Sequence, residues 1–108
     1  MKAVTQITPA GLKALMDARS PYCLVDVREP WEVELARIDG SVAIPLNDIP
    51  ARLQELDALA TIIVMCKLGG RSQRAAEFLV DNGFDRVSNL QGGIDAWARD
   101  VDPQLPAY

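Results

Sequence analysis

The chain has 108 residues, of which 49% are apolar and 24% are charged, and its formal net charge at pH 7 is −4. This length suffices for one domain with its own hydrophobic core, so we expect a single domain over residues 1–108. No apolar run approaches the roughly 18 residues of a membrane helix, and the acidic balance argues against a nucleic-acid partner, for which a basic stripe is expected.

The composition also restricts the chemistry. The chain contains no histidine, which excludes a Cys-His pair, a Ser-His-Asp triad and a histidine-ligated metal. Its two cysteines, Cys23 and Cys66, form no C-x-x-C pair and do not suggest a disulfide framework. Residues 1–9 lack the long apolar stretch of a signal peptide. We therefore expect a protein of the reducing cytoplasm, with no membrane partner and with neither a metal nor an organic cofactor indicated.

The first predicted element is a helix over residues 8–17, because Thr8 suits an N-cap and Pro9 suits the first helical position. A strand is predicted over residues 22–28, apolar at first and polar at its carboxyl end. Cys23 lies in the apolar part of this strand, so we expect it in the core.

Asp26 and Arg28, at the polar end of that strand, allow two interpretations. They could serve as a catalytic acid and an anion ligand. Alternatively, they could form a structural ion pair that shapes the nearby loops, which is the interpretation we favour.

Three short elements are predicted in the middle of the chain. A helical segment begins near Pro30, with Trp31 and Leu35 on one face. Residues 41–46 resemble a short strand that follows an Asp-Gly turn. Apolar residues at helical spacing then predict a helix over residues 47–56.

The second half of the chain repeats the alternation of strand and helix. Residues 62–65, I-I-V-M, are apolar and mostly β-branched, which is typical of a strand buried on both faces of a parallel sheet. An amphipathic helix is predicted from Ser72, with a C-cap at Asn82-Gly83. A short strand over residues 84–89 and a last helix after Gly92-Gly93 complete the pattern. This alternation predicts an α/β domain with a mainly parallel central sheet and helices on both faces.

The loop after Cys66 is the strongest candidate site. Cys66 ends the buried strand, and the carboxyl ends of such strands are where α/β folds place their chemistry. Gly69 and Gly70 allow the loop to curl, so that its amides can form an anion-binding nest at the start of the following helix. Together with the positive charge of Lys67 and Arg71, this nest would lower the pKa of the Cys66 thiol. The alternative is that Cys66 is a small buried hydrophobic residue at a strand end.

Several segments together are similar in order and spacing to a single-domain rhodanese, a family of sulfurtransferases. The resemblance covers nearly the whole chain and is carried by L-V-D-V-R-E at 24–29, I-D-G-S at 38–41 with I-P at 44–45, C-K-L-G-G-R-S at 66–72, A-A at 75–76 with Leu79, G-F at 83–84 and L-Q-G-G-I-D-A-W at 90–97.

The resemblance implies a rhodanese-like three-layer fold and transfer of a sulfane sulfur through a cysteine persulfide. It implies that Cys66 takes sulfur from a donor such as thiosulfate and passes it to cyanide, to another thiol or to a protein acceptor. It also implies that the loop amides hold the donor and the persulfide. Lys67 and Arg71 would then bind an anionic donor, and the hydroxyl of Ser72 would support the loop. The substrate-binding residues implied are Lys67, Leu68, Gly69, Gly70, Arg71 and Ser72.

One departure from the family pattern and three rival functions accompany this hypothesis. Ala36-Arg37 stands where the family often has Gly-His, which could alter the acceptor surface. A phosphatase or arsenate reductase would have C-x-x-x-x-x-R, whereas Cys66 and Arg71 here are separated by four residues. The other rivals are a non-catalytic regulatory module, which would commonly lack the cysteine, and a persulfide carrier that serves a partner protein. No order is predicted for the tail, residues 103–108.

Overall fold

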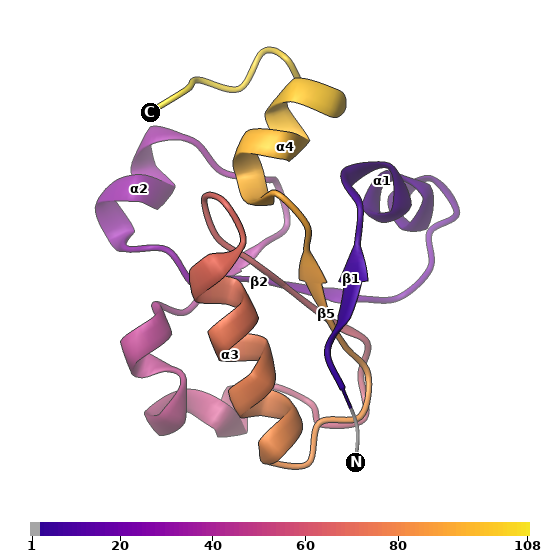
Figure 1. Cartoon of the computed structure of the whole chain (residues 1–108), viewed down its shortest axis with the longest axis vertical. Coiled ribbons are helices and arrows are strands. Elements are labelled where there is room, and N and C mark those ends of the chain that lie inside the picture. The colour runs from indigo at the N-terminus through magenta and orange to yellow at the C-terminus, as the bar shows by residue number, and fades with distance from the viewer. Residues whose placement is uncertain (1–2) are drawn as a thin grey trace.

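The computed structural model describes residues 3–108 and contains a five-stranded sheet whose described pairings are all parallel (Figure 1). The strand order across the sheet is β1-β5-β4-β2-β3. The strands are β1 (Thr5–Ile7), β2 (Cys23–Asp26), β3 (Val42–Ala43), β4 (Ile62–Met65) and β5 (Val87–Leu90). The α-helices are α1 (Pro9–Asp17), α2 (Pro30–Leu35), α3 (Gly70–Asp81) and α4 (Gly93–Asp100), and two 3₁₀ helices are η1 (Leu46–Asp48) and η2 (Pro50–Glu55).

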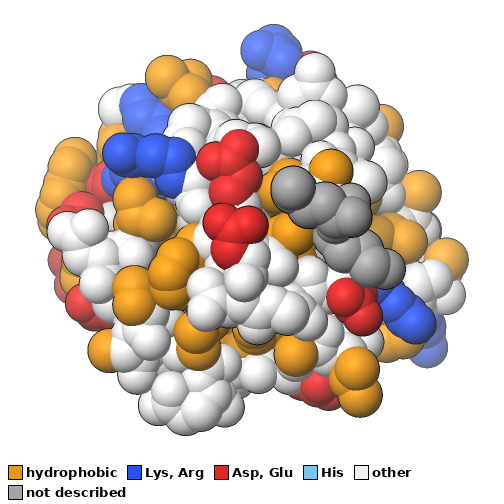
Figure 2. Space-filling model, turned by 60° about the horizontal axis from the view of Figure 1, so that its bottom comes forward, with side chains coloured by type: hydrophobic (Ala, Val, Ile, Leu, Met, Phe, Trp, Pro, Cys, Tyr) orange, Lys and Arg blue, Asp and Glu red, His pale blue; other side chains and the backbone are white. Residues whose placement is uncertain are grey.

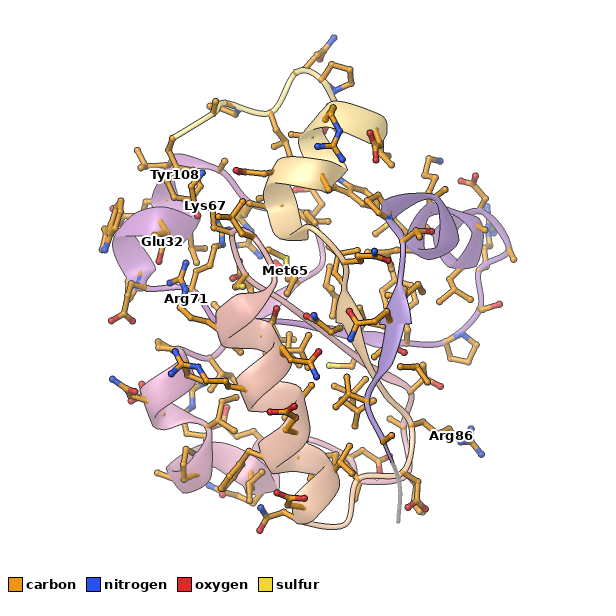
Figure 3. The ribbon with its side chains drawn as sticks, viewed as in Figure 1. Glu32, Met65, Lys67, Arg71, Arg86 and Tyr108 are labelled. Carbon is orange, nitrogen blue, oxygen red and sulfur yellow. The ribbon has the colours of Figure 1, made fainter. Side chains whose placement is uncertain are left out.

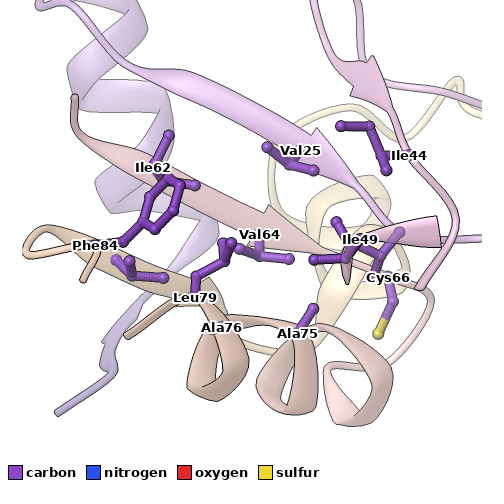
Figure 4. Close-up of a cluster of buried hydrophobic side chains, with 12 residues drawn as sticks. Val25, Ile44, Ile49, Ile62, Val64, Cys66, Ala75, Ala76, Leu79 and Phe84 are labelled. Atoms are coloured by element: carbon purple, nitrogen blue, oxygen red, sulfur yellow. The ribbon is translucent and has the colours of Figure 1, made fainter. Parts of the chain in front are cut away.

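The central strand β4 separates two hydrophobic cores. All four of its residues are buried, and because side chains alternate along a strand, they divide between the two faces of the sheet. Ile62 and Val64 pack in the core beneath α3, together with residues of η1 and η2 (Figure 4). Ile63 and Met65 pack on the other face, in the core that α1 and α4 cover. The predicted three-layer α/β domain is therefore confirmed.

The helix boundaries follow local chemistry. Thr8 caps α1, because its side chain accepts a hydrogen bond from the Gly11 amide, and Pro9 is the first helical residue. At the carboxyl end of α3, Asn82 is the C-cap and Gly83 has a φ of +91°, a left-handed conformation that glycine adopts without steric cost. Both predicted caps are confirmed.

The helix predicted over residues 47–56 is wrong in type. The chain forms the two 3₁₀ helices η1 and η2 there, because Pro50 has no N–H for an α-helical bond and Arg52 leaves helical geometry with φ −119° and ψ 17°. The apolar face itself is present, since Ile49 is buried and Leu53 packs against the same core.

The strand predictions differ from the structure mainly at their ends. β1 was not predicted, because it is a short edge strand of three residues, most of which are exposed. β5 begins at Val87 rather than at residue 84, and β3 is limited to Val42 and Ala43. Cys23 is half-buried and packs against the core at the start of β2, so it lies at the margin of the core rather than in its centre.

Charge is dispersed on the face shown in Figure 2. A local group of basic side chains lies beside acidic ones, and apolar side chains are scattered between them, without a continuous basic stripe on that face. Among residues 3–108, no helix is both long and apolar enough to cross a membrane.

Candidate active site

Cys66 lies at the carboxyl end of β4, with its sulfur directed toward the first turn of α3 (Figure 4). The residue is 2% exposed. Three donors surround Sγ: the amide of Gly69 at 3.1 Å, the amide of Ser72 at 3.4 Å and the hydroxyl of Ser72 at 3.2 Å. This arrangement favours negative charge on the sulfur, because each donor stabilises a thiolate better than a thiol.

The pKa of the Cys66 thiol reflects two opposing effects. Burial raises the pKa, whereas hydrogen bonds from the Ser72 side chain and from the amides of Ser72, Gly69 and Leu68 lower it. The net pKa lies below the usual thiol value. Cys66 is thus a thiol whose surroundings favour the nucleophilic thiolate form without a histidine.

The loop geometry depends on one glycine in particular. Gly69 precedes α3 with φ +114°, a conformation that other residues rarely adopt, and its amide points at Sγ. Gly70 has no positive φ, so only the first of the two glycines uses this freedom. The amides of Gly70 and Arg71 donate to no acceptor within residues 3–108, as expected at the first positions of a helix. These two donors are available to an anion bound next to Cys66.

Asn89, near the carboxyl end of β5, supports the loop by hydrogen bonds to Ser72 and Gly69. Its Oδ1 lies 2.5 Å from the Ser72 hydroxyl, and its Nδ2 donates to the Gly69 carbonyl at 3.2 Å. Ser72 is fully buried, and its single hydroxyl proton can serve either Asn89 or Cys66. Sequence reasoning did not assign Asn89 to the site. The available signal was a polar residue at the carboxyl end of a predicted strand.

Arg71 is bound to a carboxylate rather than directed freely at the cradle. Its two terminal nitrogens donate to Glu32 of α2 at 2.6 and 2.9 Å. The hydrogen bond from Arg71 lowers the pKa of Glu32 to about 2, against the opposing effect of burial. Glu32 was also missed from sequence, because its only signal was an acidic residue within a predicted helix.

Lys67 lies at the other end of the loop and has a carboxylate of its own. Its ammonium group donates to both oxygens of Asp95 at 3.0 Å and to the backbone carbonyl of Tyr108 at 2.6 Å. Leu68, between the two ends, is 67% exposed. Figure 3 shows Lys67, Arg71, Glu32 and Tyr108 gathered around the loop next to α2.

Asp26 and Arg28 form a buried ion pair, with 2.7 Å between Asp26 Oδ2 and Arg28 Nη2, and neither side chain is exposed. The same guanidinium nitrogen donates to the carbonyl of Ala36 at 2.7 Å, and Nη1 donates to the carbonyl of Glu32 at 3.3 Å. The structural interpretation of this pair is therefore confirmed, since it ties α2 and the following segment to the sheet. Arg37, in place of the family's usual histidine, donates to the Ser41 carbonyl within its own turn.

Comparison with known proteins identifies the class. The family model described as "Rhodanese-like domain" matches residues 8–100, so the chain belongs to the rhodanese-like domain family. A protein of Allochromatium vinosum named sulfurtransferase is 34% identical over 96 residues, which cover 89% of this chain and 90% of that protein. A crystal structure titled as a rhodanese-like domain protein from Staphylococcus aureus covers 100% of this chain and 99% of its own, with a TM-score of 0.82 and 30% identity.

A longer relative matches through one part of its length. The maize protein named "Adenylyltransferase and sulfurtransferase MOCS3-1" is 36% identical over 110 residues, which cover 95% of this chain but only 24% of that protein. The chain thus spans about a quarter of the length of this curated relative. The family match and the names of these relatives support sulfur transfer as the general reaction class.

Proposed function

We propose that the protein is a thiosulfate sulfurtransferase that carries sulfur as a persulfide on Cys66. The Cys66 thiolate attacks the outer sulfur of thiosulfate, the S–S bond of the donor breaks, and sulfite leaves with the bonding electron pair. Cyanide then attacks the outer sulfur of the persulfide, which releases thiocyanate and restores the thiolate. The single observation that carries this proposal is the convergence of the Gly69 and Ser72 donors on Sγ.

In this proposal, different loop residues stabilise the outer and the inner sulfur of the persulfide. The amides of Gly70 and Arg71 stabilise the outer sulfur and the donor as negative charge moves between them. Gly69, through its amide and its left-handed conformation, and Ser72, through both of its donors, hold the inner sulfur. No proton transfer is required, because attacking and leaving groups are anions, and this is consistent with a chain that lacks histidine.

Lys67 and Arg71 attract an anionic donor in this proposal. Lys67 is paired with Asp95 and Arg71 with Glu32, so neither acts as a free cation. Each ion pair instead presents the positive end of its dipole at the edge of the loop. The direct test of the proposed function is the mass of the protein after exposure to thiosulfate, with Cys66→Ser as the control. A gain of one sulfur that requires Cys66 is the expected result, and its absence would contradict the proposal.

A protein thiol is a second candidate acceptor. It is favoured by Leu68, an apolar side chain that the loop itself exposes to solvent, and by Trp31, which is 60% exposed on α2. Slow turnover with cyanide but fast transfer to a protein thiol would identify this as the principal reaction.

The remaining rivals fit the geometry less well. A phosphatase or arsenate reductase cradle has five residues between its cysteine and its arginine, whereas four residues separate Cys66 from Arg71 here. A non-catalytic module has no need for a cysteine whose sulfur accepts from two loop amides and lies within hydrogen-bond distance of the Ser72 hydroxyl.

A further inference from the structure

Tyr108 contacts Lys67 at one end of the active-site loop and is linked to Arg71 at the other end through Glu32, although it lies far from the loop in the sequence. Figure 3 shows its side chain beside Lys67 and Glu32, with Arg71 below them. Tyr108 makes no hydrogen bond to Cys66. Its contacts are instead with the charged groups that surround the cradle.

The hydroxyl of Tyr108 bridges two buried charged groups. It donates to Glu32 Oε2 at 2.8 Å and accepts from Arg28 Nη1 at 2.9 Å. Glu32 Oε2 is also the oxygen that accepts from Arg71 Nη2 at 2.9 Å. The hydroxyl therefore fixes the carboxylate oxygen that in turn fixes the guanidinium of Arg71.

The ring and the main-chain carbonyl of Tyr108 contact Lys67, at the other end of the loop. The ammonium nitrogen of Lys67 lies 4.5 Å from the ring centroid and 2.6 Å from the carbonyl oxygen. Trp31 supports the ring from a second side in an edge-to-face contact, with 6.1 Å between ring centroids.

We infer that Tyr108 is a positioning residue that holds Lys67 and the Glu32–Arg71 pair in place around the cradle, and so tunes the site for anionic donors. This inference rests on the proposed function, because it names the residue that orders the donor-binding groups. The physical reason is preorganisation: long cationic side chains that are already fixed lose little conformational freedom when an anion binds. A neutral hydroxyl and ring provide this order without adding charge to the site.

The test compares Tyr108→Phe, which removes only the hydroxyl, and Tyr108→Leu, which also removes the ring. The matched control is Tyr22→Phe, since Tyr22 is a half-buried tyrosine that packs in the core covered by α1 and α4 and forms no side-chain hydrogen bond within residues 3–108. Two kinds of measurement are made. The first is the KM for thiosulfate, with kcat and the KM for cyanide. The second is the ratio of the rates at which iodoacetate, an anion, and iodoacetamide, which is neutral, alkylate the Cys66-containing peptide.

For Tyr108→Phe we expect the KM for thiosulfate to rise about threefold to tenfold, with kcat and the KM for cyanide changed less than twofold. The ratio of iodoacetate to iodoacetamide rates should fall, and Tyr108→Leu should show larger changes in both quantities. Tyr22→Phe should resemble the wild type. A structural role alone would lower stability without separating the anionic reagent from the neutral one.

The alkylation ratio keeps this inference separate from the proposed function, because it needs no sulfur transfer. If the wild type does not turn over thiosulfate but the ratio falls in the Tyr108 variants, the proposed function fails and the positioning role stands. If both Tyr108 variants keep the wild-type ratio, the side chain of Tyr108 does not position the cations and the inference is overturned.

Discussion

At the scale of single residues, the reactivity of Cys66 depends on a balance between burial and hydrogen bonding. Burial alone would keep the sulfur as a thiol, whereas the Ser72 hydroxyl and the loop amides stabilise the thiolate, and the pKa falls below its usual value. The arrangement differs from the cysteine–histidine pairs of many enzymes, because here the thiol and the donors that stabilise its thiolate lie within seven consecutive residues, 66–72.

The lowered pKa of Cys66 can be measured directly. We expect the rate of alkylation of Cys66 by iodoacetamide to rise with pH and to reach its midpoint below the ordinary thiol value of about 8.5, because only the thiolate reacts. Ser72→Ala should move the midpoint upward, since it removes the side-chain hydrogen bond that lowers the pKa. A wild-type midpoint at or above about 8.5 would refute this description of the site.

Arg71 provides a second test at this scale. We expect Arg71→Ala to reduce kcat/KM for thiosulfate about tenfold while the KM for cyanide changes much less, because the donor carries more negative charge than the acceptor. Arg86→Ala is the matched control, since Arg86 lies at the far end of the molecule (Figure 3).

Removal of Arg71 also leaves the Glu32 carboxylate without its cation. The double variant Glu32→Gln, Arg71→Ala separates this effect from the loss of the cation itself. Equal losses with thiosulfate and cyanide in both variants would mean that Arg71 supports the loop and does not bind the donor.

At the scale of elements, the sequence predicted those parts of the fold that local chemistry determines. The buried run of β4, the Thr8 cap and the Asn82-Gly83 cap all depend on neighbouring residues, and each is present. The 3₁₀ helices were mistaken for one helix because 3₁₀ and α-helices place apolar residues at similar intervals, and Pro50 decided between them.

The partners of the loop were harder to predict. Ser72 could be assigned to the site because it belongs to the loop, whereas Glu32, Asn89 and Tyr108 reach it only through tertiary packing. Their sequence separation from the loop is large, and no local pattern marks them. A parallel sheet brings the ends of its strands to one edge, but it does not specify which polar residues point toward the cysteine.

The pair of Glu32 and Arg71 joins α2 to α3 and makes stability depend on pH. The Glu32 side chain is 3% exposed, and its pKa falls from 4.5 to about 2 on folding. Its contribution to the free energy of unfolding is therefore complete above about pH 4.5 and is lost as the pH falls toward 2. The magnitude is up to about 3 kcal/mol.

We expect Glu32→Gln to destabilise the protein at pH 7, with a difference from the wild type that shrinks as the pH is lowered from 5 to 2. Urea unfolding at several pH values measures this difference. The same substitution at Glu77, which is exposed on α3, should have little effect at any pH. A Glu32→Gln difference that stays constant between pH 7 and pH 2 would exclude this linkage.

At the scale of the whole molecule, the parallel sheet collects distant segments around one cysteine. β4 leads directly into Cys66, β5 supports the loop through Asn89, and α2 and α4 each supply a carboxylate to a loop cation. The tail, for which no order was predicted, packs over the loop through Tyr108. The site is thus a product of the complete domain, although its reactive segment is continuous in the sequence.

The role of Cys66 as the sulfur carrier is tested by the intact mass of the reduced protein after incubation with thiosulfate. We expect the wild type and Cys23→Ser to gain one sulfur each, Cys66→Ser to gain none, and the added sulfur to disappear when cyanide is supplied. If the wild type gains no sulfur, or if Cys66→Ser gains as much as the wild type, then Cys66 is not the sulfur carrier.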